Sequence, residues 1–288
     1  MKKRSLALSL LAATLAFSVT AAHAAEKLKI GVAAMISPKE TFKYYQDLLN
    51  YIGEKVGLEV ELVQKPTYAE MDGLLKNEEV GVAFVCSGPY VKDKAEFGVE
   101  LLVAPVSYGQ PFYHAYIIVP KDSLAKAMSD LGGKKFAFTD PHSNTGYIVP
   151  TYMIGKGFSK TPEQFFKEIM FTKSHDKSIE AVAKKLADGA AVDSLIFDYA
   201  AKTNPQYTKE TRILEKSPAY GIPPIVVTKA MDPAVKAKLR DAFLKVHEDP
   251  KGKEIISKIM VDKFIVPDDA NYDSVREMEK WLKEFAKI

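Results

Sequence analysis

The sequence has 288 residues, of which 47% are hydrophobic and 27% are charged, and its formal net charge is +3. This composition is typical of a packed globular protein and excludes a disordered chain. Three basic residues, Lys2, Lys3 and Arg4, account for the whole excess, so the rest of the chain is formally neutral. No basic face for nucleic acid is expected.

Residues 1–24 have the pattern of a secretory signal peptide. The basic start precedes an apolar run over residues 6–19, and Ala22 and Ala24 flank a cleavage position before Ala25. The apolar run is short for a membrane span, although a retained anchor is the alternative. The missing cysteine at the cleavage point argues against a lipoprotein. The mature chain is therefore expected in the periplasm, without a membrane span.

The first half of the mature chain alternates strands and helices. Apolar alternation predicts strands at residues 27–34 and 59–64, and an apolar run predicts a strand buried on both faces at 80–86. Helical spacing predicts helices at 39–56 and 68–75. This order predicts a mostly parallel sheet covered by helices.

Cys86, at the end of the third strand, is the only cysteine, so no intramolecular disulfide can form. Its apolar neighbours indicate a buried thiol, and a reactive or metal-binding thiol is the alternative. No metal site is predicted.

A second unit repeats the alternation. Strands are expected at residues 135–138, 169–171 and 194–197, with helices at 146–155 and 177–186. The pattern predicts a second α/β lobe.

Two β-rich segments, 113–120 and 223–228, lie between the units and are predicted to form a hinge. Helices expected at 233–247, 250–259 and 273–287 would return to pack on the first lobe. Two facing α/β sheets place helix N-termini around a cleft. Such N-termini carry unpaired N–H groups and partial positive charge, which favours anions.

The segment from residue 136 to 150 is the most informative part of the sequence. A strand leads to the turn opener Asp140–Pro141, and Ser143, Asn144, Thr145 and Gly146 follow before an apolar helix. Ser143 suits an N-cap. An ordinary capped helix is one interpretation; an anion site is the other, because three small hydrogen-bonding side chains gather where an anion is favoured.

This segment resembles the D-P-x-S-x-S/T-G-x-x-x-P motif of the phosphate/phosphite/phosphonate-binding proteins of ABC transporters, the PhnD-like family. Further segments that resemble the family's motifs, in the correct order, are 66–69, 112–113, 174–175 with 179–183, and 187–199. The resemblance covers nearly all of the mature chain. It implies an α/β fold of the two-lobed type II periplasmic-binding-protein class, with residues 25–117 plus 226–288 in lobe 1 and 118–225 in lobe 2.

The resemblance also implies the residues that hold an oxyanion. They are Ser143, Asn144, Thr145, Gly146 and His175, with Asp193 close by and with Tyr68 and Tyr113 closing from the opposite lobe. Asn144 departs from the motif, since this position is often Thr. Its amide can still donate a hydrogen bond but extends further into the site, so a ligand of different size is expected.

Two of these residues have simpler interpretations. His175 could be a surface or capping residue; beside an anion, its pKa is expected to rise. Asp193 could be a solvated or capping carboxylate. Beside an oxyanion, it would accept a proton from P–OH and so reject anions that lack one.

The positions where aminoalkylphosphonate-binding members are expected to carry acids hold Leu195 and Pro223 here, which predicts a small ligand without an amine. His114 is expected to pack at the hinge, and His142 to lie in the anion loop and point away from it.

These inferences predict the periplasmic binding component of an ABC importer, which captures a small phosphorus oxyanion by hinge closure. The expected partner is a membrane permease, and the protein is expected to be monomeric and to need no cofactor. A sensory binding protein is an alternative. An enzyme using Ser143 and His175 is a weaker one, because no residue is seen to complete a triad.

Overall fold

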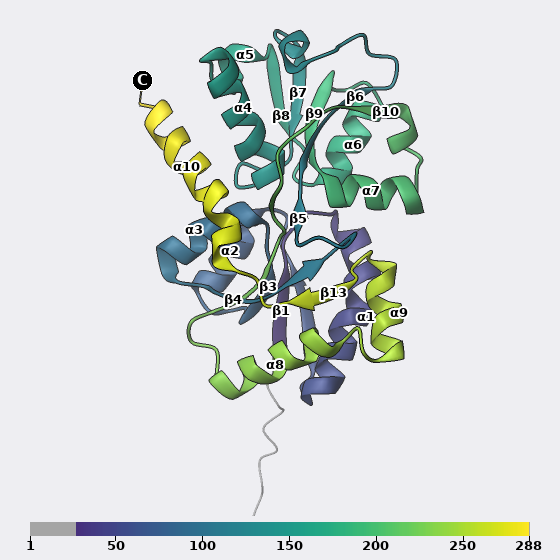
Figure 1. Ribbon diagram of the computed structural model, residues 1–288, viewed down its shortest axis with the longest axis vertical. Helices are drawn as coiled ribbons and strands as arrows, with labels where there is room; N and C mark the ends of the chain where they lie inside the picture. The colour runs from purple at the N-terminus through teal and green to yellow at the C-terminus, as the bar shows by residue number, and fades with distance from the viewer. Residues whose placement is uncertain (1–26, 288) are drawn as a thin grey trace, which may run out of the picture.

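The computed structural model describes residues 27–287, and the signal peptide predicted at residues 1–24 lies outside this range. The chain forms two α/β lobes stacked along the long axis of the molecule (Figure 1). Within residues 27–287, every helix is too short or too polar to cross a bilayer.

The first lobe is built on a six-stranded mixed sheet. Its strands, in spatial order, are β13 (Lys263–Ile265), β4 (Glu100–Val106), β12 (Ile225–Val227), β3 (Val82–Phe84), β1 (Leu28–Val32) and β2 (Val60–Gln64). The three N-terminal strands pair in parallel, as the alternation predicts. The later strands β12 and β13 pair antiparallel with their neighbours, which the sequence pattern did not reveal.

Helices cover both faces of this sheet. The helices of the first lobe are α1 (Pro38–Val56), α2 (Tyr68–Lys76), α3 (Ser87–Phe97), α8 (Pro233–Lys245) and α9 (Pro250–Lys258). Contacts place α8 and α9 against α1, and α3 against α2. The prediction that α8 and α9 return to the first lobe is confirmed.

The second lobe contains a five-stranded sheet. Its strands, in spatial order, are β10 (Thr211–Lys216), β6 (Ala115–Pro120), β9 (Gly189–Asp193), β7 (Lys135–Phe138) and β8 (Glu168–Phe171). Its α-helices are α4 (Val149–Phe158), α5 (Pro162–Phe165), α6 (His175–Ala183) and α7 (Ser194–Thr203). The chain crosses between the lobes twice, and at the crossings β5 (Phe112–Tyr113) pairs with β11 (Tyr220–Gly221).

One predicted element is wrong. Residues 194–197 are the first turn of α7, and the strand is β9, which ends at Asp193. The Asp193 carboxylate accepts the Leu195 N–H at 2.7 Å and so caps the helix. A short apolar run fits either a strand or a buried helix turn, and here the cap decides.

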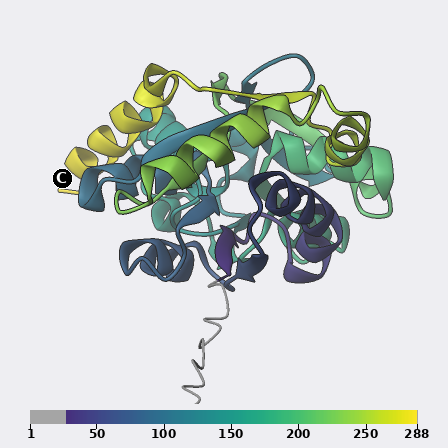
Figure 2. The ribbon, with the colours of Figure 1, turned by 90° about the horizontal axis from the view of Figure 1, so that it is seen from below.

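The last helix, α10 (Asp273–Phe285), does not pack on the first lobe alone. It contacts both α3 and α4, and it lies at the edge of the molecule in Figures 1 and 2. A Cβ placed on Gly155 of α4 would come within 2.7 Å of the Trp281 ring. Trp281 is the only tryptophan in the sequence, so its fluorescence reports directly on contact between α10 and the second lobe.

Candidate functional site

The turn from Ser143 to Gly146 follows β7 and begins a widened helical turn, Asn144–Ile148, that continues into α4. The Ser143 hydroxyl accepts the Gly146 N–H at 3.0 Å. The N–H groups of Asn144 and Thr145 belong to the first turn, where no carbonyl four residues back is available. The side chains of Ser143, Asn144 and Thr145 are fully buried. The turn is therefore a capped helix start that presents N–H donors inside the protein.

His175 lies beside this turn at the start of α6. Its Nδ1 accepts the backbone N–H of Asp193 at 3.0 Å and is 3.0 Å from the Thr139 hydroxyl. Its Nε2 is 3.5 Å from the Ser143 hydroxyl. An Nδ1 that accepts a backbone N–H requires the proton of a neutral ring to be on Nε2. His175 therefore directs one N–H toward the Ser143 turn.

The pKa of His175 differs from the value expected beside an anion. Full burial lowers its pKa to about 3. The imidazole is thus neutral at physiological pH, and it acts as a hydrogen-bond donor without a charge. It is neither a surface residue nor a simple cap.

Asp193 lies at the end of β9 and is 1% exposed. Burial raises the pKa of its carboxyl to about 7, against the lowering effect of the backbone N–H groups of Leu195 and Ile196. It is a capping carboxylate, as one interpretation held, but it is not solvated. A carboxyl group that titrates near neutral pH can accept or hold a proton at the site.

Three residues of the first lobe complete the walls. Tyr68 begins α2, and its backbone N–H donates to the Asp140 carboxylate at 3.3 Å. The Tyr113 hydroxyl accepts the Asn144 amide N–H at 3.1 Å and lies 3.7 Å from the Cys86 sulfur. Tyr68 and Tyr113 therefore do lie opposite the Ser143 turn.

Cys86 also lies beside the Ser143 turn, a position that the sequence did not predict. It is fully buried, and the backbone N–H groups of Asn144 and Gly88 interact with its sulfur. Burial is the main cause of its raised pKa, so the thiol is neutral. The available signal was its position between a buried strand and a helix start, which is also the position of Ser143 and of Asp193.

Three buried oxygen atoms at this site have no hydrogen-bond partner in the described chain: Tyr68 Oη, Asn144 Oδ1 and Thr145 Oγ1. The Tyr68 hydroxyl interacts with the Ser143 hydroxyl, but not at hydrogen-bond geometry. Buried polar atoms without partners cost free energy, and natural proteins rarely retain them. Their convergence at one helix start indicates a site for a polar ligand.

The lobes are closed over the site. The His175 backbone N–H donates to the Met35 carbonyl at 3.0 Å, and the Ser37 backbone N–H donates to the Asp176 carboxylate at 3.0 Å. The His142 ring does not point into free space, because its Nδ1 lies 3.0 Å from the Asp72 carboxylate of the first lobe. These contacts join segments that the sequence separates by 70 residues or more.

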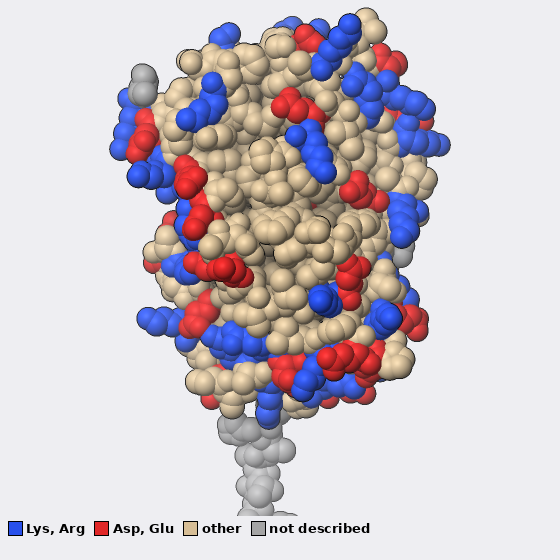
Figure 3. Space-filling model, in the orientation of Figure 1, with Lys and Arg blue, Asp and Glu red and all other residues tan. Residues whose placement is uncertain are grey.

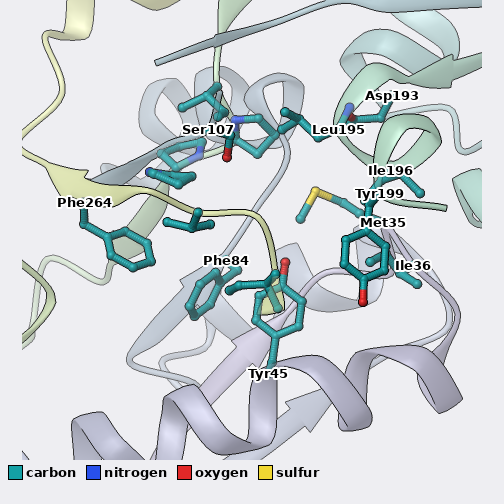
Figure 4. A pocket seen from close by; sticks show the side chains of 16 residues that line it. Met35, Ile36, Tyr45, Phe84, Ser107, Asp193, Leu195, Ile196, Tyr199 and Phe264 are labelled. Carbon is teal, nitrogen blue, oxygen red and sulfur yellow. The ribbon is translucent and has the colours of Figure 1, made fainter. Parts of the chain in front are cut away.

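Other candidates lie outside this group. The His114 Nδ1 is 2.9 Å from the Ser217 carbonyl, which ties the two crossing segments together. Leu195 and Pro223 line an adjacent, largely apolar pocket (Figure 4). Figure 3 shows charges of both signs scattered over one face, whereas the hollowed band between the lobes is mostly uncharged.

Comparisons with known proteins agree with this architecture. A family described as "ABC transporter, phosphonate, periplasmic substrate-binding protein" matches residues 30–272. The phosphonates-binding periplasmic protein of Escherichia coli is 25% identical over 89% of this chain and 78% of its own length.

Two solved structures share the fold. A binding protein component of an ABC phosphonate transporter from Pseudomonas aeruginosa has a TM-score of 0.85 at 23% identity, covering 90% of this chain and 87% of that one. PhnD1 of Prochlorococcus marinus, in complex with methylphosphonate, has a TM-score of 0.81 at 16% identity, covering 89% and 98%. Because the family match spans most of the chain, the protein belongs to the periplasmic substrate-binding proteins of phosphonate ABC transporters, a family of transport proteins and not of enzymes.

Proposed function

We propose that the protein captures a small phosphorus oxyanion at the Ser143 turn. The observation that carries this proposal is the convergence of three unpartnered buried oxygens, the Thr145 N–H and the His175 Nε2–H on one helix start. The Tyr68 and Thr145 hydroxyls and the His175 Nε2–H can donate to a tetrahedral anion, and Asn144 Oδ1 can accept the proton of a P–OH group. The low dielectric of a closed site strengthens each bond. The Asp193 carboxyl, with its pKa near 7, is suited to accept the proton of a P–OH group.

The proposed cycle needs no chemistry on the ligand. An open form binds the anion, and the closed form docks on a membrane permease. The two crossings at residues 107–114 and 217–224 act as the hinge, in place of the predicted segments 113–120 and 223–228, because most of those segments form the sheet strands β6 and β12. The division into residues 25–117 plus 226–288 and residues 118–225 stays a prediction, as do the monomeric state and export through the signal peptide. The family and the closed site support this cycle.

A matched pair of threonine variants tests the proposal. Thr145 and Thr151 both carry a buried hydroxyl without a hydrogen-bond partner in the described chain, but only Thr145 lies in the Ser143 turn. Thr145→Val should weaken the Kd of methylphosphonate about 10- to 100-fold, because a bond to a charged group contributes roughly 1.5–3 kcal/mol. Thr151→Val should leave it unchanged.

Isothermal titration with phosphite, methylphosphonate, phosphate and sulfate measures both variants, and Trp281 fluorescence reports closure. Equal effects of the two substitutions on the Kd would show that the Ser143 turn does not contact the ligand. The absence of binding by every phosphorus compound would refute the proposed function.

The His142–Asp72 bridge should make capture depend on pH. The hydrogen bond to Asp72 raises the pKa of His142. The bridge is therefore fully present below about pH 6.5 and is lost as pH rises through the raised pKa. Since the His142 side chain is 30% exposed, the gain in affinity should be at most about fivefold.

This dependence is measured as the ratio of the Kd of His142→Gln to that of the wild type from pH 6 to 8.5. Asp193 titrates in both proteins, so the ratio isolates His142. The ratio should fall toward one as pH rises, and Asp72→Asn should behave similarly. A ratio that does not change with pH would show that the bridge does not hold the lobes.

A further inference from the structure

A second compartment lies next to the Ser143 turn. It has a volume of about 90 Å³, several times the roughly 10–15 Å³ that one water needs on the same measure. The first lobe contributes Met35, Tyr45 and Phe84, and α7 contributes Leu195 (Figure 4). Pro223 closes it from the crossing segment. The compartment is thus formed only when both lobes and a crossing come together.

Its walls are mostly apolar. Of the sixteen lining residues, the only ones with polar side chains are Ser107, Asp193, Tyr45 and Tyr199. Among the residues whose side chains the structure describes, no lysine, arginine or histidine lines it, and Asp193 is its one carboxylate. Such walls favour an uncharged group that gains by leaving water.

The compartment adjoins the oxyanion site through two residues. Asp193 lines the pocket with its side chain, while its backbone N–H donates to His175 Nδ1. Met35 also lines the pocket, and its carbonyl accepts the His175 backbone N–H. Asp193 and Met35 therefore belong both to the surroundings of His175 and to the wall of the apolar pocket.

We propose that this pocket receives an apolar substituent of about four to six carbon atoms on a phosphonate, so that the cognate ligand is an alkyl- or arylphosphonate. This inference rests on the proposed function, because it assigns the group attached to the same oxyanion. An aminoalkyl substituent is the rival occupant. Among the side chains that the structure describes in this pocket, its ammonium would have only Asp193 as an anionic partner, and we assign that carboxyl to the P–OH group of the same ligand.

Isothermal titration with a ligand series tests the inference. Methyl-, ethyl-, propyl- and butylphosphonate should bind with a Kd that falls about fourfold per added methylene, as the burial of one CH₂ predicts. Phenylphosphonate should bind more tightly than methylphosphonate, and 2-aminoethylphosphonate more weakly than propylphosphonate, which has the same number of heavy atoms in its substituent.

Substitution of a pocket wall provides the second arm. Leu195→Ala should reduce the ratio of methyl to butyl Kd several-fold, whereas Leu124→Ala, at a leucine that is 93% exposed in the second lobe, should leave the ratio unchanged. Leu195→Glu should reverse the preference and favour 2-aminoethylphosphonate. The ratio compares two ligands on one protein, so partial misfolding does not mimic the effect.

The outcomes separate the two proposals. If phosphite and methylphosphonate bind but longer alkyl chains bind no better, the apolar pocket does not receive the ligand and the oxyanion site stands. Tighter binding of 2-aminoethylphosphonate than of propylphosphonate would also overturn the inference. If none of the phosphorus compounds binds, the proposed function itself is wrong.

Discussion

Gly146→Ala should abolish measurable capture of methylphosphonate, with a Kd at least about 100-fold weaker, and should lower the melting temperature by several degrees. A Cβ at this position would lie 2.5 Å from Thr139 Cβ and 2.6 Å from Thr139 Oγ1. Overpacking of this kind costs typically 1–3 kcal/mol, or roughly 2–4 °C per kcal/mol for a protein of this size.

The effect on binding follows from what Thr139 holds. Its hydroxyl lies 3.0 Å from His175 Nδ1, and its backbone N–H donates to the Gly146 carbonyl at 3.1 Å. A displaced Thr139 therefore shifts both the imidazole donor and the helix start. Misplaced donors lose most of their value toward a fixed anion.

Gly157→Ala is the matched control. Gly157 lies on the same helix, and a Cβ there would meet no atom within 4 Å. The substitution Gly157→Ala should stabilise the protein by up to about 1 kcal/mol, because alanine has a higher helix propensity than glycine. Calorimetric melting and titration measure both variants. Wild-type affinity in Gly146→Ala would show that the turn does not hold the ligand.

Asp193→Asn should produce the second large effect, a free protein that is more stable at pH 8 but binds protonated oxyanions about 10- to 100-fold more weakly. Burial raises the pKa of Asp193 from 3.8 to about 7. Between these values the folded protein holds a proton that the unfolded chain has released. The free energy of unfolding therefore falls as pH rises from about 4 to 7 and stays low above it.

The size of this effect follows from the gap between 3.8 and about 7. At about 1.4 kcal/mol per pH unit, the buried charge costs on the order of 4 kcal/mol above pH 7. Asparagine caps helices as well as aspartate does, so Asp193→Asn should remove the cost and keep the cap. Denaturant unfolding from pH 4 to 8 should show a flatter profile than the wild type.

Ligand selectivity should change in parallel. An amide can donate to sulfate, so Asp193→Asn should narrow the difference in Kd between methylphosphonate and sulfate. Asp232→Asn is the control, since Asp232 caps α8 through the N–H groups of Ala234 and Val235 without contact with the site. Unchanged selectivity between methylphosphonate and sulfate in Asp193→Asn would show that the Asp193 carboxyl does not accept a hydrogen bond from the ligand's P–OH group.

Several features could be predicted from the sequence because they are local. The Ser143 turn is encoded by a capping serine, small hydrogen-bonding residues and a following apolar helix, all within eight residues. The alternation of periodicities likewise predicts two α/β units, since the side-chain period of each element depends only on its own residues. The family motifs then order these units into one fold.

Other features depend on how distant segments pack. Cys86 and Tyr113 meet the Ser143 turn only because three separate helix starts and a crossing converge. The strand predicted at residues 194–197 was wrong because a short apolar run is compatible with a strand and with a buried helical turn. The end of β9 at Asp193 and the cap that this residue forms make the run helical. The contact of α10 with both lobes depends on the packing of Trp281 against Gly155. The hydrophobic periodicity of α10 does not reveal this contact.

The sequence by itself determined the α/β alternation of the lobes, the capped Ser143 turn and the family, because these follow from local patterns and motif order. Only the tertiary structure decided that His175 is a neutral donor and that Asp193 titrates near neutral pH, since desolvation depends on everything packed around a group. It also decided that Leu195 and Pro223 share an apolar pocket with Phe84. The pKa values and the lining of the pocket both depend on residues that are distant in the sequence and adjacent in space, which a linear pattern does not specify.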